Sequence, residues 1–426
     1  MTAPNLTVNV EPLVSGNVTY LPLGAPSVDS ESMVMIALRL EITNNYSDRN
    51  VKVTGIKFDF PSSSVNMKNV NHYGNMDIGP GDIVYWSNGR VDYIPPDPVK
   101  KDNNCQFLPA PGPANVTIRL TCEGYSDDFT ITKDLVSHKS PTGSGSYLFP
   151  YSHSELESNE YFTTEAQHWS NGGEYGSQIF NQDIGVVGLD PQSQKWSGIF
   201  NTSDLNNEDY RIWGKSIRAI ADGEVKFSRD TYDENTIIKI DGEFQFPEKP
   251  VGAPDDWGMG NYISIEINNT ELINFCHLQK GSIPNSLKLA GAKVKVGEII
   301  GKVGNTGHST NPHTHIECMN ISGALRPFPY RNTLVVAYNQ LELFNTIGMW
   351  VRLEAEGVPK EKSAVCPLPS IWLKKEIIKL LDSRQISHGS NIQVKKAIDL
   401  LYNSFGIPPV KRSNNVTSAI MDFILR

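Results

Sequence analysis

The fold of this chain is set first by short runs in which apolar and polar residues alternate. The first 140 residues contain four such runs, separated by Asn, Asp, Gly and Pro: "MVMIALRLEITN", "VKVTGIKFDF", "NVTIRLTCEG" and "DFTITKDLV". Because successive side chains of a strand point to opposite faces of a sheet, these runs predict half-buried β-strands. Their number and spacing predict an antiparallel β-sandwich over residues 1–140.

The pattern changes twice further along the chain. The stretch "SHKSPTGSGSYLFPYSHS" is rich in turn-forming residues and predicts a linker at 141–160. Residues 161–335 return to strand patterns such as "SIRAIADGEVKFS" and "AKVKVGEIIGKVG". In residues 336–426, "IWLKKEIIKLLDSR" and "NIQVKKAIDLLYNSFG" place apolar residues at helical spacing. We therefore expect a mainly β protein with an N-terminal sandwich, a central β-rich domain and a small, mostly helical C-terminal region.

Composition excludes several classes of function. With 426 residues, 39% hydrophobic and 20% charged, the chain fits a soluble protein of two or three domains. It has no run of roughly 18 apolar residues, so we expect no transmembrane segment. The net charge of -9 is spread along the chain, which argues against a nucleic-acid partner. Five cysteines without C-x-x-C spacing indicate neither a zinc knuckle nor a dense disulfide framework.

A histidine pair lies in the segment "GNTGHSTNPHTHIE", residues 304–317. Nine histidines would produce about 0.2 H-x-H pairs by chance, so the pair alone is a weak motif. The sequence "HTHIE" has the alternation of a strand, which would put His313 and His315 on one face, roughly 6.6 Å apart along the backbone. One imidazole could then bind a metal ion beside the other. The competing interpretation is a pair of surface histidines at the end of a strand.

Four segments of the central region together resemble the lysostaphin-like zinc endopeptidases of bacterial cell walls. They occur in the family's order over about 100 residues: "SIRAIADGEV", "NFCHL", "GAKVKVGEIIGKVGNTG" and "HTHIE". The resemblance implies a lysostaphin-like peptidase domain at 161–335 with zinc as its cofactor. It also implies hydrolysis of peptide bonds, by family analogy those of peptidoglycan, through a metal-activated water.

The same resemblance assigns roles to individual residues. His315 and Asp183, the latter in "NQDIGVV", correspond to zinc ligands, and a catalytic zinc usually takes three protein ligands and a water. His313 would act as general base, and His277 would stabilise the oxyanion or protonate the departing amine. Glu317 has the position of a residue that could hydrogen-bond to the metal ligands without binding the metal itself. The competing interpretations are a partly buried histidine at 277 and a turn carboxylate at 183.

The chain departs from the family at the first zinc ligand. The family has a histidine four residues before the aspartate, whereas this chain has Ile179, and Gln178 beside it is a poor zinc ligand. Some family members resemble "QHWSNGGEYGSQIFNQD", with a histidine further upstream, so we expect His168 to be the third ligand. The segment "ALRPFPYR" favours this option. The alternatives are His153, His308 and no third ligand.

Three functions compete on this sequence. The first is the metallopeptidase, and the second is an inactive pseudo-peptidase that serves as a cell-envelope binding or regulatory module. A biotinyl or lipoyl carrier domain is the third, and it fails because no lysine lies at a suitable turn. The family implies an extracellular or cell-envelope location, although "MTAPNLTVNVEP" shows no signal peptide. The sandwich would be a targeting, prodomain-like or substrate-binding module. The helices would form a cap or docking unit, and the oligomeric state stays open.

Overall fold

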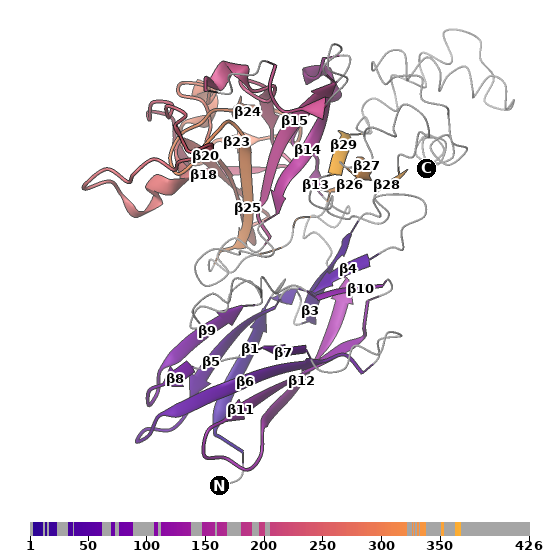
Figure 1. Cartoon of the computed structure of the whole chain (residues 1–426), viewed down its shortest axis with the longest axis vertical. Helices are drawn as coiled ribbons and strands as arrows, with labels where there is room; N and C mark the ends of the chain where they lie inside the picture. Colours follow the sequence, from indigo (N-terminus) through magenta and orange to yellow (C-terminus); the bar gives the residue numbers. More distant parts are fainter. Residues whose placement is uncertain are drawn as a thin grey trace, which may run out of the picture.

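The computed structural model is mainly β, which confirms the fold class that the sequence predicted (Figure 1). It describes residues 3–137 except 12, 15–16, 24–32, 37, 62–69, 73–75, 88–105 and 110–111. It also describes 147–167 except 158–159, 180–189, 196–200, 205–321, and short pieces between 326 and 367. We call the described residues up to 137 the N-terminal unit and those from 147 the central unit. Within them, no helix is long and apolar enough to cross a membrane.

The N-terminal unit contains two sheets. The smaller has the strand order β1 (Leu6–Glu11), β5 (Arg39–Asn44) and β9 (Ile83–Ser87). The larger has the order β10 (Gln106–Pro109), β4 (Met33–Ile36), β3 (Asn17–Leu23), β12 (Phe129–Ser137), β11 (Asn115–Cys122), β6 (Val51–Asp59) and β7 (Val70–His72). Two further strands pair with β3 and β6, namely β2 (Leu13–Val14) and β8 (Met76–Ile78).

The alternation in the sequence explains how this unit forms its core. Every second residue of β1 and β11 is buried, and these side chains join one apolar cluster that includes Val8, Leu40, Phe58 and Ile118. One pairing differs from an all-antiparallel sandwich, because β12 and β3 run parallel. The paired residues Val18 and Leu135 lie 117 positions apart in the sequence, and nothing local in either strand sets their relative direction.

The central unit is built on one large sheet. Its main path runs β23 (Lys293–Val294), β18 (Gly223–Arg229), β21 (Tyr262–Ile267), β22 (Glu271–Cys276), β25 (Thr314–Asn320), β15 (Gln182–Leu189), β14 (Glu160–Gln167), β29 (Ser363–Pro367), β27 (Thr333–Ala337) and β28 (Val351–Arg352), with β16 (Trp196–Ser197) on β15. Three two-stranded sheets accompany it: β13 (Tyr147–Leu148) with β26 (Tyr330–Arg331), β17 (Ser216–Arg218) with β24 (Ile299–Lys302), and β19 (Lys239–Ile240) with β20 (Glu243–Phe244).

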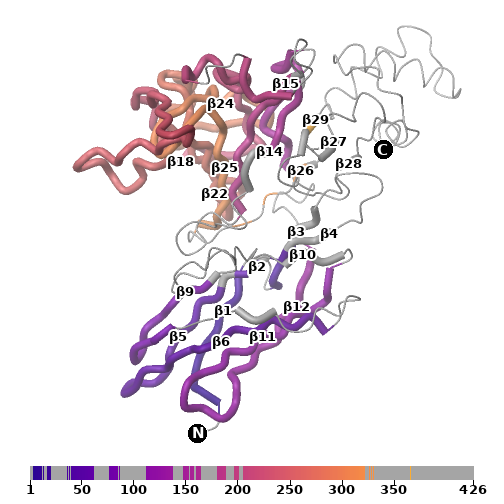
Figure 2. Tube along the Cα trace, in the orientation of Figure 1, coloured from indigo at the N-terminus to yellow at the C-terminus, as the bar shows by residue number. Residues whose placement is uncertain are grey.

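The strands in the middle of this sheet are covered on both faces. In β21 and in β22 five of six residues are buried, and in β25 four of seven are buried. The apolar cluster around them includes Phe162, Ile263, Phe275 and Ile316. Figure 2 shows these strands gathered in one body, with the indigo and purple strands of the N-terminal unit gathered in another. A strand buried on both faces offers a rigid base for functional side chains.

Secondary structure outside the strands is limited to short 3-10 turns in the described residues. They are η1 (His153–Glu155), η3 (Asn207–Asp209), η4 (Asp255–Met259) and η5 (Asn285–Leu287). The structure differs from the expected segments at two places. Strand β13 and turn η1 lie within the expected linker 141–160, and β28 and β29 lie within the region expected to be mostly helical. The helical patterns after residue 367 lie outside the described residues.

A buried arginine joins the two units. Arg326 donates a 2.8 Å hydrogen bond from Nη1 to Oε2 of Glu11 in the N-terminal unit, and its own side chain is only 7% exposed. Nearby, Glu271 at the start of β22 accepts a hydrogen bond from the Tyr147 hydroxyl. Burial raises the pKa of Glu271 to about 7, although the charge of Arg326 opposes this rise. Glu271 is therefore a titratable group in the core of the central unit.

The raised pKa of Glu271 predicts a pH-dependent stability. Below about pH 4.5 the carboxyl is protonated in both states, whereas between 4.5 and 7 only the unfolded state ionises, so stability falls as pH rises. At about 1.4 kcal/mol per pH unit, the loss is about 3 kcal/mol. Glu271→Gln removes the titration. In denaturant unfolding at several pH values, the variant should gain this amount over the wild type between pH 4.5 and 7. Parallel profiles would contradict the burial effect.

Candidate metal centre

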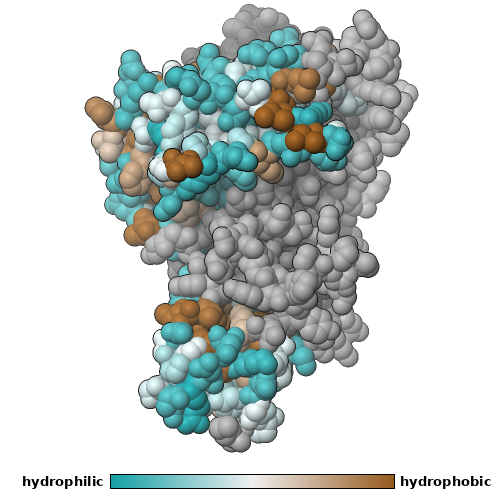
Figure 3. Space-filling model, turned by 60° about the vertical axis from the view of Figure 1, so that its left-hand side comes forward, coloured by the Kyte–Doolittle hydropathy of each residue, from teal (hydrophilic) through white to brown (hydrophobic). Residues whose placement is uncertain are grey.

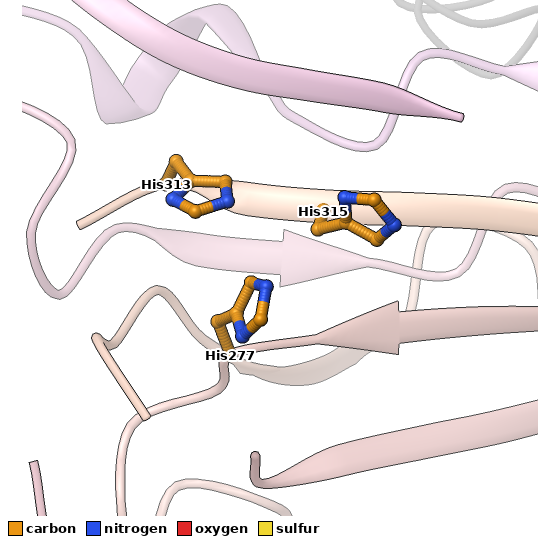
Figure 4. Close-up of side chains that lie close together, drawn as sticks. All are labelled: His277, His313 and His315. Carbon is orange, nitrogen blue, oxygen red and sulfur yellow. The ribbon is translucent and has the colours of Figure 1, made fainter. Parts of the chain in front are cut away.

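The candidate site is organised by the register of three neighbouring strands. Strand β25 lies between β22 and β15, and His315 is directly opposite Asp183 on one side and Cys276 on the other. His277 follows the end of β22, and His313 precedes the start of β25. Figure 4 shows the three imidazoles gathered where these two strand ends meet. The pairing of distant segments therefore assembles four of the five residues expected at the site.

The distances within this group are those of a compact cluster. His315 Nδ1 lies 2.8 Å from Oδ1 of Asp183, and His313 Nε2 lies 3.7 Å from the same oxygen. One ring nitrogen from each of His277, His313 and His315 lies within 4.8 Å of the others. The side chains of His313 and Asp183 are each 14% exposed, so the cluster is enclosed without being sealed from solvent.

His277 is held in an unusual backbone conformation by two turns. Its φ is +60°, which few residues with a side chain adopt, and its N–H donates to the Met259 carbonyl at the end of η4. Its ring Nδ1 donates to the Thr306 carbonyl at 2.7 Å. Burial, together with the neighbouring histidines 313 and 315, lowers the pKa of His277 well below its ordinary value. The ring is therefore neutral, with the lone pair on Nε2.

The two turns that hold His277 pack backbone against backbone. Gly260 and Gly307 both have positive φ, and a Cβ on Gly260 would lie 2.3 Å from the Thr306 carbonyl oxygen. Asn261 ties the turns together, because its N–H donates to the Thr306 hydroxyl and its side chain to the Leu278 carbonyl. The glycines of "GNTG" are therefore needed for this close approach.

His313 and His315 are oriented by different partners. His313 donates from Nδ1 to the Asn311 carbonyl at 2.8 Å, which turns its Nε2 toward Asp183. Burial disfavours a charge on His315, but its hydrogen bond to Asp183, with the charges of Asp183 and Glu317, raises its pKa. Cys276, opposite His315, is buried, and burial together with Glu317 and Asp183 raises its thiol pKa well above the usual value. This thiol stays protonated.

A group of polar side chains, hydrogen-bonded to one another, adjoins the histidine cluster. Glu317 accepts hydrogen bonds from Asn274 Nδ2 at 2.6 Å and from Asn181 Nδ2 at 3.2 Å, while Asn274 accepts one from the Ser264 hydroxyl. Asn181 also contacts His315 Nε2 at 3.0 Å. Sequence reasoning anticipated a supporting role for Glu317 but missed both asparagines. The signal available was position, since Asn181 precedes Asp183 by two residues and shares its face.

The expected third ligand lies outside the described residues, as do Ile179 and Gln178. Of the alternatives, the side chain of His153 is also outside them. His308 is described, and its ring stacks on Phe246 with 4.2 Å between centroids, while the Trp257 ring is tilted against it at 6.3 Å. It is not part of the described group whose nitrogens converge. The structure therefore gathers Asp183, His277, His313 and His315, and leaves the position of a further ligand as an expectation.

The chemistry of these donors fits a divalent metal ion. Imidazole nitrogen and carboxylate oxygen are the ligands that zinc takes in catalytic sites, usually three with one position left for water. The carboxylate of Asp183 and the Nδ1 of His315 point at one another across a gap that ligands of one ion would share. His277 and His313 stand beside this pair, where they could move protons. The fold and site thus define a β-rich domain that carries the donor set of a metal centre.

Comparison with known proteins finds a family that part of this domain resembles. Residues 250–327 match Peptidase family M23, as the sequence resemblance implied. The match includes His277, His313 and His315 but begins after Asp183 and His168. It therefore leaves the carboxylate to the geometry alone, and His168 stays an expectation from the sequence.

Two relatives match over 58 residues. One, an uncharacterised metalloprotease of Buchnera aphidicola, is 45% identical, and the other, the peptidoglycan DD-endopeptidase ShyC of Vibrio cholerae, is 41% identical. Each match covers 14% of this chain and only 14% and 12% of the respective relatives. The catalytic domain of lysostaphin from Staphylococcus simulans is 18% identical over 38% of this chain and 79% of its own, with a TM-score of 0.20. At that score, the family assignment rests on the sequence match.

Proposed function

We propose that this chain is a zinc-dependent endopeptidase that hydrolyses peptide bonds of bacterial cell-wall peptidoglycan. The observation that carries the proposal is the convergence of Asp183 and His315, 132 residues apart in sequence, beside two further imidazoles. The match of residues 250–327 to Peptidase family M23 supports the reaction type, and the name of the Vibrio relative supports the substrate class. The proposed location is the cell envelope or the extracellular space, where that substrate lies.

The residues divide the work between holding the metal and moving protons. Asp183 and His315 would hold the zinc, with His168 as the proposed third ligand. A bound zinc would supply Lewis acidity and lower the pKa of a coordinated water toward 7. His313 donates its Nδ1–H to the Asn311 carbonyl, so its Nε2 can act as a base for the attacking water. His277 Nε2, once protonated, would stabilise the developing oxyanion or donate to the leaving amine.

An exposed arm beside the site supports a polymeric substrate. The described residues on the face in Figure 3 are largely hydrophilic, with apolar side chains in small separate patches. Exposed apolar residues on the β19 and β20 arm include Ile238, Ile240 and Phe246, and Phe246 lies against His308 on the turn that precedes the histidine pair. A projecting arm that touches the loop of the site suits an extended peptide chain better than a small molecule.

A pseudo-peptidase is the second candidate function. The observation in its favour is Ile179 at the position where the family has its first zinc ligand. Against it stands the cost of gathering three imidazoles and a carboxylate in a mostly buried site. Such groups lose hydration on burial, and an inactive binding module would gain nothing from keeping them. The metal content of the chain decides between the two functions.

The proposed function predicts a zinc content near one per chain after purification with zinc present, measured by atomic emission. His168→Ala should lower that content, while Ile179→Ala, a matched change on the same segment, should not. The wild type should also clear a peptidoglycan suspension in a chelator-sensitive way. A zinc-free chain with no such clearing would establish the pseudo-peptidase instead. Loss of zinc in His315→Ala alone would remove His168 from the site.

A further inference from the structure

The side chain of Asn181 presents a hydrogen-bond donor to His315, whereas the usual partner of a metal-binding histidine is a hydrogen-bond acceptor. A histidine that binds a metal through one ring nitrogen usually donates the N–H of its other nitrogen to an acceptor. Here the nitrogen away from Asp183 is Nε2, and the group that faces it at 3.0 Å is the amide NH2 of Asn181. Two donors cannot share one hydrogen bond, so this amide requires a lone pair on Nε2.

Glu317 fixes the orientation of that amide. The carboxylate accepts from Asn274 on one side and from Asn181 on the other, and an ionised carboxylate is an acceptor only. Turning the Asn181 amide around would place its Oδ1 against Oε2 of Glu317, so that two acceptors met. Asn181 directly precedes β15, and the register that pairs Asp183 with His315 brings it within hydrogen-bond distance of Glu317.

The orientation of the amide in turn selects a tautomer of the ring. In a neutral imidazole one nitrogen carries the hydrogen and the other the lone pair. With the lone pair on Nε2, the hydrogen is on Nδ1, where it is donated to Asp183 at 2.8 Å. In this state His315 offers no lone pair toward Asp183. A cation held between these two groups needs the opposite tautomer, with the lone pair on Nδ1.

We propose that Asn181 is a positioning residue whose amide, oriented by Glu317, holds His315 in the tautomer that Asp183 also favours and opposes metal binding until it turns over. This proposal deepens the proposed function and, for its metal step, rests on it. The amide then has two positions. Its NH2 faces the ring in the metal-free chain, and its Oδ1 accepts from Nε2–H in the metal-bound chain. Glu317 favours the first position and therefore weakens the affinity for zinc.

The tautomer can be read directly in the metal-free full-length chain labelled with 15N-histidine. In long-range 1H–15N spectra recorded where the ring is neutral, His315 should show a protonated Nδ1 and an unprotonated Nε2. Its signals are identified by their loss in His315→Gln. Because the Asp183 carboxylate also favours a hydrogen on Nδ1, the effect of the amide is read in Asp183→Ala, which should keep the single-tautomer pattern. The further change Asn181→Leu in that variant should abolish it. Gln182→Leu is the matched control, since Gln182 is the next residue, a buried amide on the opposite face, and should leave the pattern unchanged.

The metal step is tested by zinc titration. Glu317→Gln frees the Asn181 amide to turn, so the zinc Kd of this variant should fall by about tenfold. That factor is the lower end of the range over which groups hydrogen-bonded to a metal ligand change metal affinity. Zinc should also move the His315 proton to Nε2 in the wild type. A protonated Nε2 in the metal-free wild type, or a Glu317→Gln Kd equal to or above that of the wild type, overturns the proposal. The tautomer of the metal-free chain is measured without zinc. If the chain binds no zinc, the proposed function is wrong, but the spectra still decide the role of Asn181.

Discussion

The variants His315→Ala and Asp183→Ala should each lose their bound zinc and at least about 10³-fold in peptidase activity. Metal-ion catalysis is worth several kcal/mol of transition-state stabilisation, and each 1.4 kcal/mol is about a factor of ten in rate. Both residues come from the paired strands β15 and β25, so either change opens the same site. Zinc content and initial rates on soluble peptidoglycan fragments measure the two effects together.

Gln182→Ala is the control for this pair of variants. Gln182 is buried in the same strand as Asp183 but points to the other face, so its loss perturbs packing without removing a donor from the cluster. It should keep its zinc and its rate. If Asp183→Ala keeps full zinc content, the carboxylate is not a ligand, and the 2.8 Å contact with His315 is only a hydrogen bond.

The variants His277→Asn and His313→Gln should keep their zinc yet lose about 10²- to 10⁴-fold in activity, the usual range for proton-transfer groups. Asparagine is chosen at position 277 because it tolerates the φ of +60° better than alanine does. The fall should be in kcat rather than KM, because these imidazoles act on the reacting atoms and do not anchor the peptide.

Zinc content also separates two arrangements of the cluster. The nitrogens of His277, His313 and His315 lie within 4.8 Å of one another, which would suit an ion held by three histidines as well as by Asp183 and His315. If His277→Asn loses zinc along with activity, the three-histidine arrangement is correct and His277 is a ligand. Retained zinc with a lowered kcat supports its assignment to proton transfer.

The sequence predicted the mainly β fold class and the closeness of the two histidines of the pair. The alternation in "HTHIE" placed His313 and His315 together, and both lie within 4 Å of the Asp183 carboxylate. It failed at particular neighbours, because it did not find Asn181 or Asn274. The mostly helical region 336–426 stays a prediction, since its helical patterns lie outside the described residues. Asparagine has no sequence pattern of its own, and the role of its side chain depends on which residue the neighbouring strand places opposite it.

Local sequence decided the features that have a local cause. Alternating side chains determined that the chain is mainly β, and the glycines and histidines of residues 304–317 determined the turn and the shared face of the pair. Strand register over long separations decided the rest. Pairing of β15 with β25 brought Asp183 to His315 across 132 residues, and pairing of β22 with β25 brought His277 beside them. Register is fixed by the packing of whole faces, so only the tertiary structure could supply it.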